Sequence, residues 1–203
     1  LPTIAVYDLE IQERECDLVA ATFGRGFYVL DNYSPLRGLT TEVLNKKAHL
    51  FETENSLLYV PADPLGLEGT GFQGHNMWAA KNPTYGAVFS LFMKDEYKTL
   101  KDVRQEKEKA LEKEKKDVYY PSFDELRKES LDEAAKLIWI ISDQSGKEIR
   151  RMSSSPTKGI VRMNWNLRSN STNAINAESN GFLVPPGTYF VSISLIHNGS
   201  VEE

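Results

Sequence analysis

Gly24, Arg25 and Gly26 form the stretch of this chain that most resembles a binding loop. A phosphate-binding loop needs glycines that open a helix, because the amide groups at a helix N-terminus hold the anion. Here the glycines precede FYVLD at 27–31, which is typical of a strand. The sequence therefore favours a β-turn in which glycine takes positive φ and Arg25 lies exposed at the tip. The alternative is that the Arg25 guanidinium grips a substrate carboxylate or a neighbouring domain.

A second group of candidates lies in the glycine- and proline-rich segment 66–85. Phe72, Trp78 and Tyr85 could stack on the face of a sugar ring, and His75 could hydrogen-bond its hydroxyls. The sequence favours the other interpretation, in which these aromatic side chains anchor a long loop to the rest of the protein. Carbohydrate or protein binding through this loop is the alternative.

Glycoside cleavage would need two carboxylic acids roughly 5–10 Å apart in one cleft. No pair stands out among the acids near strand ends and in the connection, which are Asp8, Glu10, Asp17, Asp31, Glu52, Glu54 and Asp63. Acids beside turns are usually solvated or cap the backbone. The three histidines are far apart and Cys16 is the only cysteine, so no zinc-binding spacing occurs. We therefore predict no catalytic residue, metal or cofactor, and part of a glycoside hydrolase active site is the least favoured function.

Composition narrows the class of protein. The 203 residues are 40% hydrophobic and 26% charged, as in ordinary globular proteins. The net charge of −5 argues against nucleic-acid binding, which needs a basic surface. No apolar run approaches the roughly 20 residues that cross a bilayer. The chain starts at Leu1 with no initiator methionine, so we expect it to be a segment of a longer polypeptide.

The elements that position these candidates are mainly strands. Residues 1–38 read as a meander of β-strands, and 39–85 as an extended connection. Residues 86–203 predict a β-sandwich, because antiparallel strands joined by short turns pack as two sheets. A charge-rich helical insertion interrupts it at about 96–135, where Ser122–Glu125 and Ser130–Glu133 have the spacing of two capping boxes.

Two strands of this predicted sandwich alternate cleanly between apolar and polar positions. Such alternation indicates one face toward the core and one toward solvent. We therefore expect the core to receive Val161, Met163, Trp165 and Leu167 from one strand, and Tyr189, Val191, Ile193 and Leu195 from the other. Trp139, on a third strand, is also predicted to be a core residue.

The stretch DLVAATFGRGFYVLDNYSPLRGL, from Asp17 onward, resembles a known family. It is similar to the closing blade of large exported β-propeller proteins related to sortilin and to bacterial neuraminidase-repeat glycosidases. Members carry D-L-V-x-x-T-H-G-R-G, then an aromatic-aliphatic strand and D-[DN]-x-S-P-L-R. Phe23 stands where that pattern has histidine. An acid–base role at this position is therefore not expected.

The order of later segments also resembles the region that follows the propeller in that family. GAVFSLFMKDE, YPSFDELR, ISDQSGKEIRRM, KGIVRMNWNLR and PPGTYFVSISL occur in that order. The W-x-L-R and P-G-T-Y patterns look like those of immunoglobulin-like or fibronectin-like modules appended to secreted enzymes. The resemblance implies a mainly β fold, with an immunoglobulin/fibronectin-like β-sandwich preceded by remnant β-propeller strands.

For function, the resemblance implies a non-catalytic C-terminal accessory module of an exported protein labelled a glycosyl hydrolase. The aspartate-box repeat S-x-D-x-G-x-T-W of this propeller class is absent from the chain, so no catalytic role can be transferred to it. The expected partner is the rest of the parent propeller in cis, in a periplasmic or secreted setting. Strands at 4–31 that have lost their blade neighbours should pack onto the sandwich or form a dimer.

Overall fold

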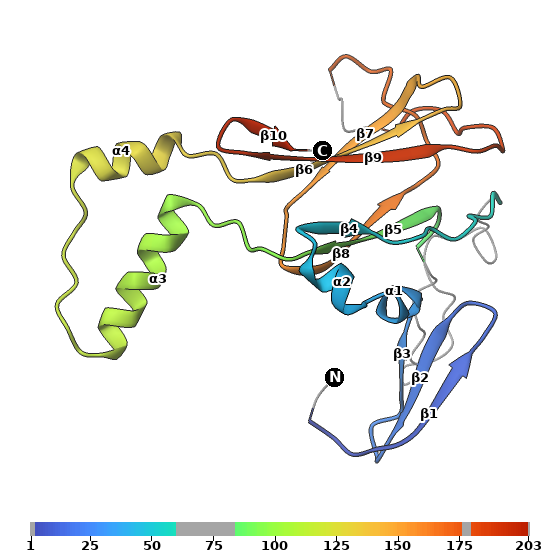
Figure 1. The fold of residues 1–203 in the computed structure, drawn as a ribbon, viewed down its shortest axis with the longest axis horizontal. Helices are drawn as coiled ribbons and strands as arrows, with labels where there is room; N and C mark the ends of the chain where they lie inside the picture. Colours follow the sequence, from blue (N-terminus) through green and yellow to red (C-terminus); the bar gives the residue numbers. More distant parts are fainter. Residues whose placement is uncertain (1–2, 60–83, 176–179, 203) are drawn as a thin grey trace, which may run out of the picture.

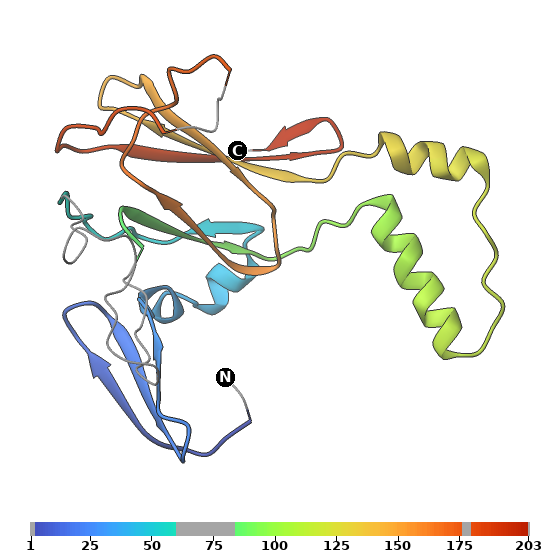
Figure 2. The same ribbon diagram turned by 180° about the vertical axis from the view of Figure 1, so that it is seen from behind.

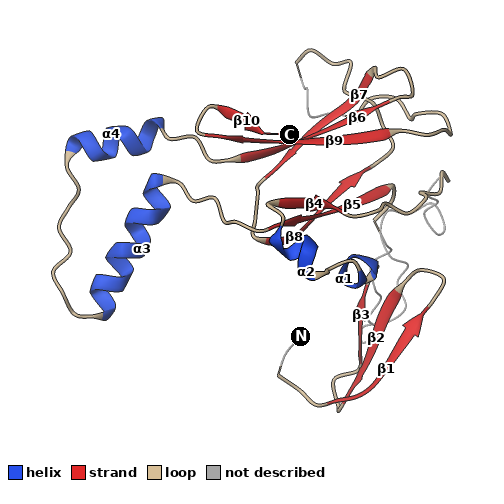
Figure 3. Cartoon of the chain, in the orientation of Figure 1, coloured by secondary structure: helices blue, strands red, loops and turns tan. Residues whose placement is uncertain are grey.

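The computed structural model of the chain describes residues 3–59, 84–175 and 180–202. These residues form a mainly β structure whose strands lie in three antiparallel sheets (Figures 1 and 3). The strands are β1 (Val6–Gln12), β2 (Asp17–Thr22), β3 (Phe27–Leu30), β4 (Ala48–Leu50), β5 (Ala87–Met93), β6 (Lys136–Ser142), β7 (Glu148–Ser154), β8 (Gly159–Trp165), β9 (Phe190–His197) and β10 (Ser200–Glu202). The helices are α1 (Ser34–Arg37), α2 (Thr41–Asn45), α3 (Leu100–Lys113) and α4 (Phe123–Leu131).

The N-terminal sheet is the meander β1-β2-β3. Its β2–β3 turn contains Gly24 and Gly26 at φ values of 73° and 77°. Residues with a Cβ atom rarely adopt such positive φ values. The Thr22 amide donates to the Gly26 carbonyl across 3.1 Å and closes this turn. The turn favoured by the sequence is therefore present, and Arg25 is exposed on it.

One face of the N-terminal sheet is apolar across all three strands. The strand register aligns Leu9 with Ala20 and Tyr28, and Ile11 with Leu18 and Leu30, so these six side chains share a face. We call them the apolar face of the N-terminal sheet. Leu9, Ile11 and Leu30 are 58%, 42% and 43% exposed on it. The rest of the described chain thus leaves much of this face in contact with solvent.

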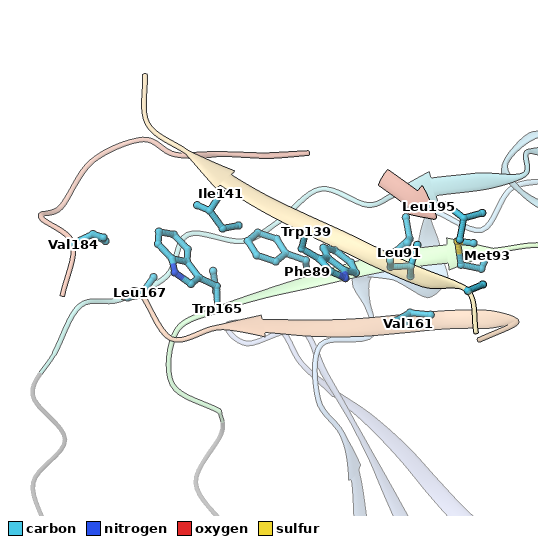
Figure 4. Close-up of a cluster of buried hydrophobic side chains, with 13 residues drawn as sticks. Phe89, Leu91, Met93, Trp139, Ile141, Val161, Trp165, Leu167, Val184 and Leu195 are labelled. Carbon is cyan, nitrogen blue, oxygen red and sulfur yellow. The ribbon is translucent and has the colours of Figure 1, made fainter. Parts of the chain in front are cut away.

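The main core lies between the other two sheets, β4-β5-β8 and β10-β9-β6-β7. Figure 4 shows side chains from both sheets meeting there. Trp139 of β6 is fully buried and stacks on Phe89 of β5 with ring centroids 6.1 Å apart. Its indole N–H donates to the Ser154 hydroxyl across 2.9 Å, so burial leaves that polar group satisfied.

The alternation read from the sequence positions the core side chains of β8 and β9. Val161, Trp165 and Leu195 are buried, as is Leu167 just beyond β8. Met163, Tyr189, Val191 and Ile193 are partly buried against the same cluster. The predicted core positions of these two strands and of Trp139 are therefore confirmed.

A second, smaller cluster lies under α2, where Val43, Phe51 and Phe92 pack together. A Cβ on Gly38 would lie 3.0 Å from two ring carbons of Phe51, so any larger residue there would press on the Phe51 ring. Both α2 and β4 fall inside the segment 39–85 that the sequence presents as an extended connection. The described beginning of that segment is thus more regular than expected.

The helical insertion expected at 96–135 contains α3 and α4, and we call residues 96–135 the helical arm. The arm projects away from the sheets (Figures 1 and 2), and neither helix has a buried residue. A capping box at Ser122–Glu125 opens α4, as predicted. The second predicted box, Ser130–Glu133, is wrong because Ser130 lies inside α4 and its hydroxyl donates to the Arg127 carbonyl.

The two helices of the arm are joined by charged groups. Arg104 of α3 donates from Nε and Nη2 to the two carboxylate oxygens of Glu129 of α4, at 2.6 and 3.0 Å. It also donates to Glu108 across 2.6 Å. These hydrogen bonds raise the pKa of Arg104 and lower that of Glu129. The arm thus depends on ion pairs and helix caps more than on buried apolar surface.

Candidate binding cleft between the sheets

A cleft of about 680 Å³ lies at one end of the core. Its walls come from both sheets, from residues 50–51 and 53–58, and from residues 184–189. The apolar side chains that line it include Phe89, Ile141, Trp165, Leu167, Val184 and Val191. We call this hollow the inter-sheet cleft. Its volume falls within the range of roughly 300–1,000 Å³ that is usual for ligand sites.

The cleft exists because the strands at this side of the molecule differ in length. β4 has three residues beside the seven of β5, and β10 has three beside the eight of β9. Neither short strand reaches the end where the cleft opens, since β4 pairs with residues 91–93 of β5 and β10 with residues 195–197 of β9. The core is consequently accessible there from the side.

At the opposite end, the two short strands close the same side of the core. Lys47, beside β4, forms an ion pair with Glu202 of β10, and this hydrogen bond raises the pKa of Lys47. A smaller hollow of about 480 Å³ remains behind them, lined by Leu91, Leu137 and Tyr97 among others. Burial raises the pKa of the Tyr97 hydroxyl, whose ring contacts His197 edge-on.

Among the described residues that line the inter-sheet cleft, Glu54 is the only carboxylic acid and Tyr189 the only phenol. The Tyr189 hydroxyl donates to the Pro185 carbonyl across 2.7 Å. The arrangement suits binding of apolar groups.

Of the predicted ligand-binding residues, the structure describes Arg25 and Tyr85, and neither of these two lines the cleft. Tyr85 packs on the edge of the core and meets Tyr59 edge-on, with ring centroids 5.0 Å apart. Phe72, His75 and Trp78 lie outside the described residues.

The remaining candidates are spread over the described structure. Arg25 is on the N-terminal sheet and does not line the cleft. Asp17 caps the backbone after β3, because its carboxylate accepts from the Asn32 amide across 2.9 Å. Asp8, Glu10, Asp31 and Glu52 are exposed, and Asp63 lies outside the described residues.

Two surveys of the described residues bear on metals and membranes. In the described ranges, no group of three or more His, Cys, Asp or Glu is arranged to hold a metal ion. None of the helices described is both long and apolar enough to cross a membrane.

The cleft itself was not predicted from the sequence. The shortness of two apolar segments could have indicated it. These are AHLF at 48–51, which a polar stretch follows, and the single apolar residue Val201 after Asn198-Gly199. Comparison with known proteins adds no assignment, since no family model, curated protein or solved structure matches the chain.

Proposed function

We propose that this chain is a non-catalytic C-terminal accessory module of a longer, exported β-propeller protein of the sortilin-like glycosyl hydrolase group. In this proposal β1–β3 are the last strands of a propeller blade. Strands β4–β10 form an immunoglobulin/fibronectin-like sandwich that carries the helical arm. The module stabilises or positions the propeller, and it binds the rest of the parent protein in cis.

The observation that carries this proposal is the uncovered apolar face of the N-terminal sheet. A three-stranded sheet with one apolar face buries that face against another element in a stable protein. Here Leu9, Ile11 and Leu30 remain about half exposed. A neighbouring sheet of the same polypeptide would supply the missing cover. Association of two copies through this face is the alternative for the isolated chain.

Strand order supports the sandwich assignment. If β4 to β10 are taken as strands A, B, C, C′, E, F and G, the two sheets read A-B-E and G-F-C-C′. An immunoglobulin-like fold places A, B and E in one sheet and G, F and C in the other. The helical arm then corresponds to a long connection between strands B and C.

Two side chains support the same assignment. Immunoglobulin-like domains bury a tryptophan on strand C, and Trp139 on β6 is fully buried. They also have a tyrosine near the start of strand F whose hydroxyl bonds to the backbone a few residues upstream. Tyr189 immediately precedes β9 and donates to the Pro185 carbonyl.

The proposal is tested by the length of the natural polypeptide that contains this sequence. An antibody raised against the 203-residue chain should detect a polypeptide several times longer in extracts of the source cells, with aspartate-box repeats in its upstream sequence. Detection of a product limited to these 203 residues would contradict the proposal. Hydrolysis of glycosides by the isolated chain would contradict its non-catalytic part.

A further inference from the structure

We infer that the free edge of β9 beside the inter-sheet cleft binds an extended peptide strand from a protein partner, with apolar side chains at every second position of that strand. The inference concerns a different part of the molecule from the N-terminal sheet. It holds whether or not the chain belongs to a propeller protein. It rests on the directions in which the N–H and C=O groups of β9 point.

The direction of each β9 backbone group follows from the β9–β10 hairpin. Asn198 and Gly199 form its two-residue turn with φ values of 50° and 72°, so the flanking residues His197 and Ser200 are a hydrogen-bonded pair. Alternate residues of a strand direct their N–H and C=O groups to the same side. Val191 and Ile193 therefore direct theirs toward the β10 side of β9.

Beyond β10 that side of β9 has no partner strand in the described structure. β10 covers residues 195–197 alone, which leaves residues 190–194 as a free edge about 17 Å long (Figure 1). No backbone hydrogen bond joins Val191 or Ile193 to a described residue on this side. Phe190, Ser192 and Ser194 direct their N–H and C=O groups the other way, toward β6.

The free edge lacks the features that normally keep strands from associating. Natural sheets protect exposed edges with charged side chains, proline or a bulge. The free edge reads Phe-Val-Ser-Ile-Ser, with no charge and no proline, and its pairing with β6 is regular. The free edge of β5 is a weaker candidate, because only residues 87–89 extend beyond the backbone bond from Phe51 to Ser90.

The cleft beside this edge fits the side chains of an added strand. A strand paired with β9 would direct every second side chain toward the core, where Phe89, Ile141 and Trp165 line the cleft. Its backbone would satisfy the outward groups of Val191 and Ile193. Strand addition combines these two elements, since backbone bonds give affinity and alternate pockets give specificity. A small apolar molecule would fill the cleft without using the free edge.

The test uses the whole chain and the synthetic peptide Lys-Thr-Val-Thr-Val-Thr-Val-Lys, whose terminal lysines aid solubility and suit the net charge of −5. We expect binding by isothermal titration calorimetry with a dissociation constant below about 1 mM. Val191→Pro removes an outward N–H and leaves the β6 ladder intact, so binding should weaken about tenfold. Ser192→Ala is the control, because Ser192 is exposed, does not line the cleft and leaves the outward N–H groups in place, so this variant should bind within about threefold of the wild type.

Hydrogen exchange of the wild-type chain keeps the test decisive if Val191→Pro fails to fold. Peptide should slow exchange of the Val191 and Ile193 amides and leave that of Ser192, which faces β6, unchanged. The inference is overturned if the peptide does not bind at about 1 mM, or if these amides gain no protection. Equal weakening by the two substitutions would overturn it too. So would a dimer of the free chain that Val191→Pro dissociates, because a second copy would then occupy the edge.

Discussion

The hydroxyl of Tyr189 links the loop before β9 to the sheet through its bond to the Pro185 carbonyl. Removing it by Tyr189→Phe should lower the free energy of unfolding by about 1 kcal/mol, the usual contribution of one such hydrogen bond. Tyr119→Phe is the matched control, because Tyr119 is 83% exposed and its hydroxyl bonds no described residue. Urea unfolding, followed by tryptophan fluorescence, measures the free energy of unfolding of both variants. Equal stability of the two variants would rule out the structural role of the Tyr189 bond.

Single positions were predictable from the sequence where one local rule decided them. The sequence predicts Trp139 and Trp165 to be core residues because both lie on strands, and both are buried. Capping boxes were less certain because the same spacing recurs inside helices. Ser130 has that spacing but lies in the last turn of α4. A box that begins at Thr99 was missed because its partner is the shorter Asp102.

At the scale of elements, the helical arm should be sensitive to acid. Hydrogen bonds from Arg104 lower the pKa of Glu129, those from Thr99 lower that of Asp102, and those from Ser122 lower that of Glu125. A depressed folded-state pKa stabilises the arm above the ordinary carboxylate pKa of about 4. That stabilisation is lost as the pH falls through the depressed values. Circular dichroism should therefore show loss of helix below about pH 4, before the sheets unfold.

Glu129→Gln should reduce helix content at neutral pH, because it removes the charge that pairs with Arg104. It should also flatten the response to acid. Glu112→Gln is its control on the exposed surface of α3, where Glu112 forms no ion pair with a described residue. Identical acid titrations of Glu129→Gln and the wild type would contradict the role assigned to the Arg104–Glu129 pair.

Element prediction succeeded for strands with clear alternation and gave no bounds for the short edge strands. β8 and β9 could be located because each has apolar residues at every second position. β4 and β10 have three residues each, too few for a pattern to emerge. The turn Asn198-Gly199 is a strong hairpin signal and could have revealed β10. The cleft remained unpredicted because it results from the lengths of strands distant in sequence.

At the scale of the whole molecule, the apolar face of the N-terminal sheet is only partly covered by the rest of the described chain. In the isolated chain its side chains are partly in water already, so polar substitution there should cost little. In a longer protein that covers this face, the same side chains would be buried. Burying one leucine or isoleucine contributes roughly 1.5–3 kcal/mol. The cost of substitution therefore reports whether a neighbour covers the sheet.

The most direct test compares the double substitution Leu9→Ser, Ile11→Ser in the isolated 203-residue chain and in the longer polypeptide that we propose contains it. Denaturant unfolding is followed at a concentration where each protein is monomeric. We predict a loss of less than about 1 kcal/mol in the isolated chain and of at least about 3 kcal/mol in the longer protein. Equally small losses in both would mean that no part of the parent protein covers this face, and would contradict the proposed role.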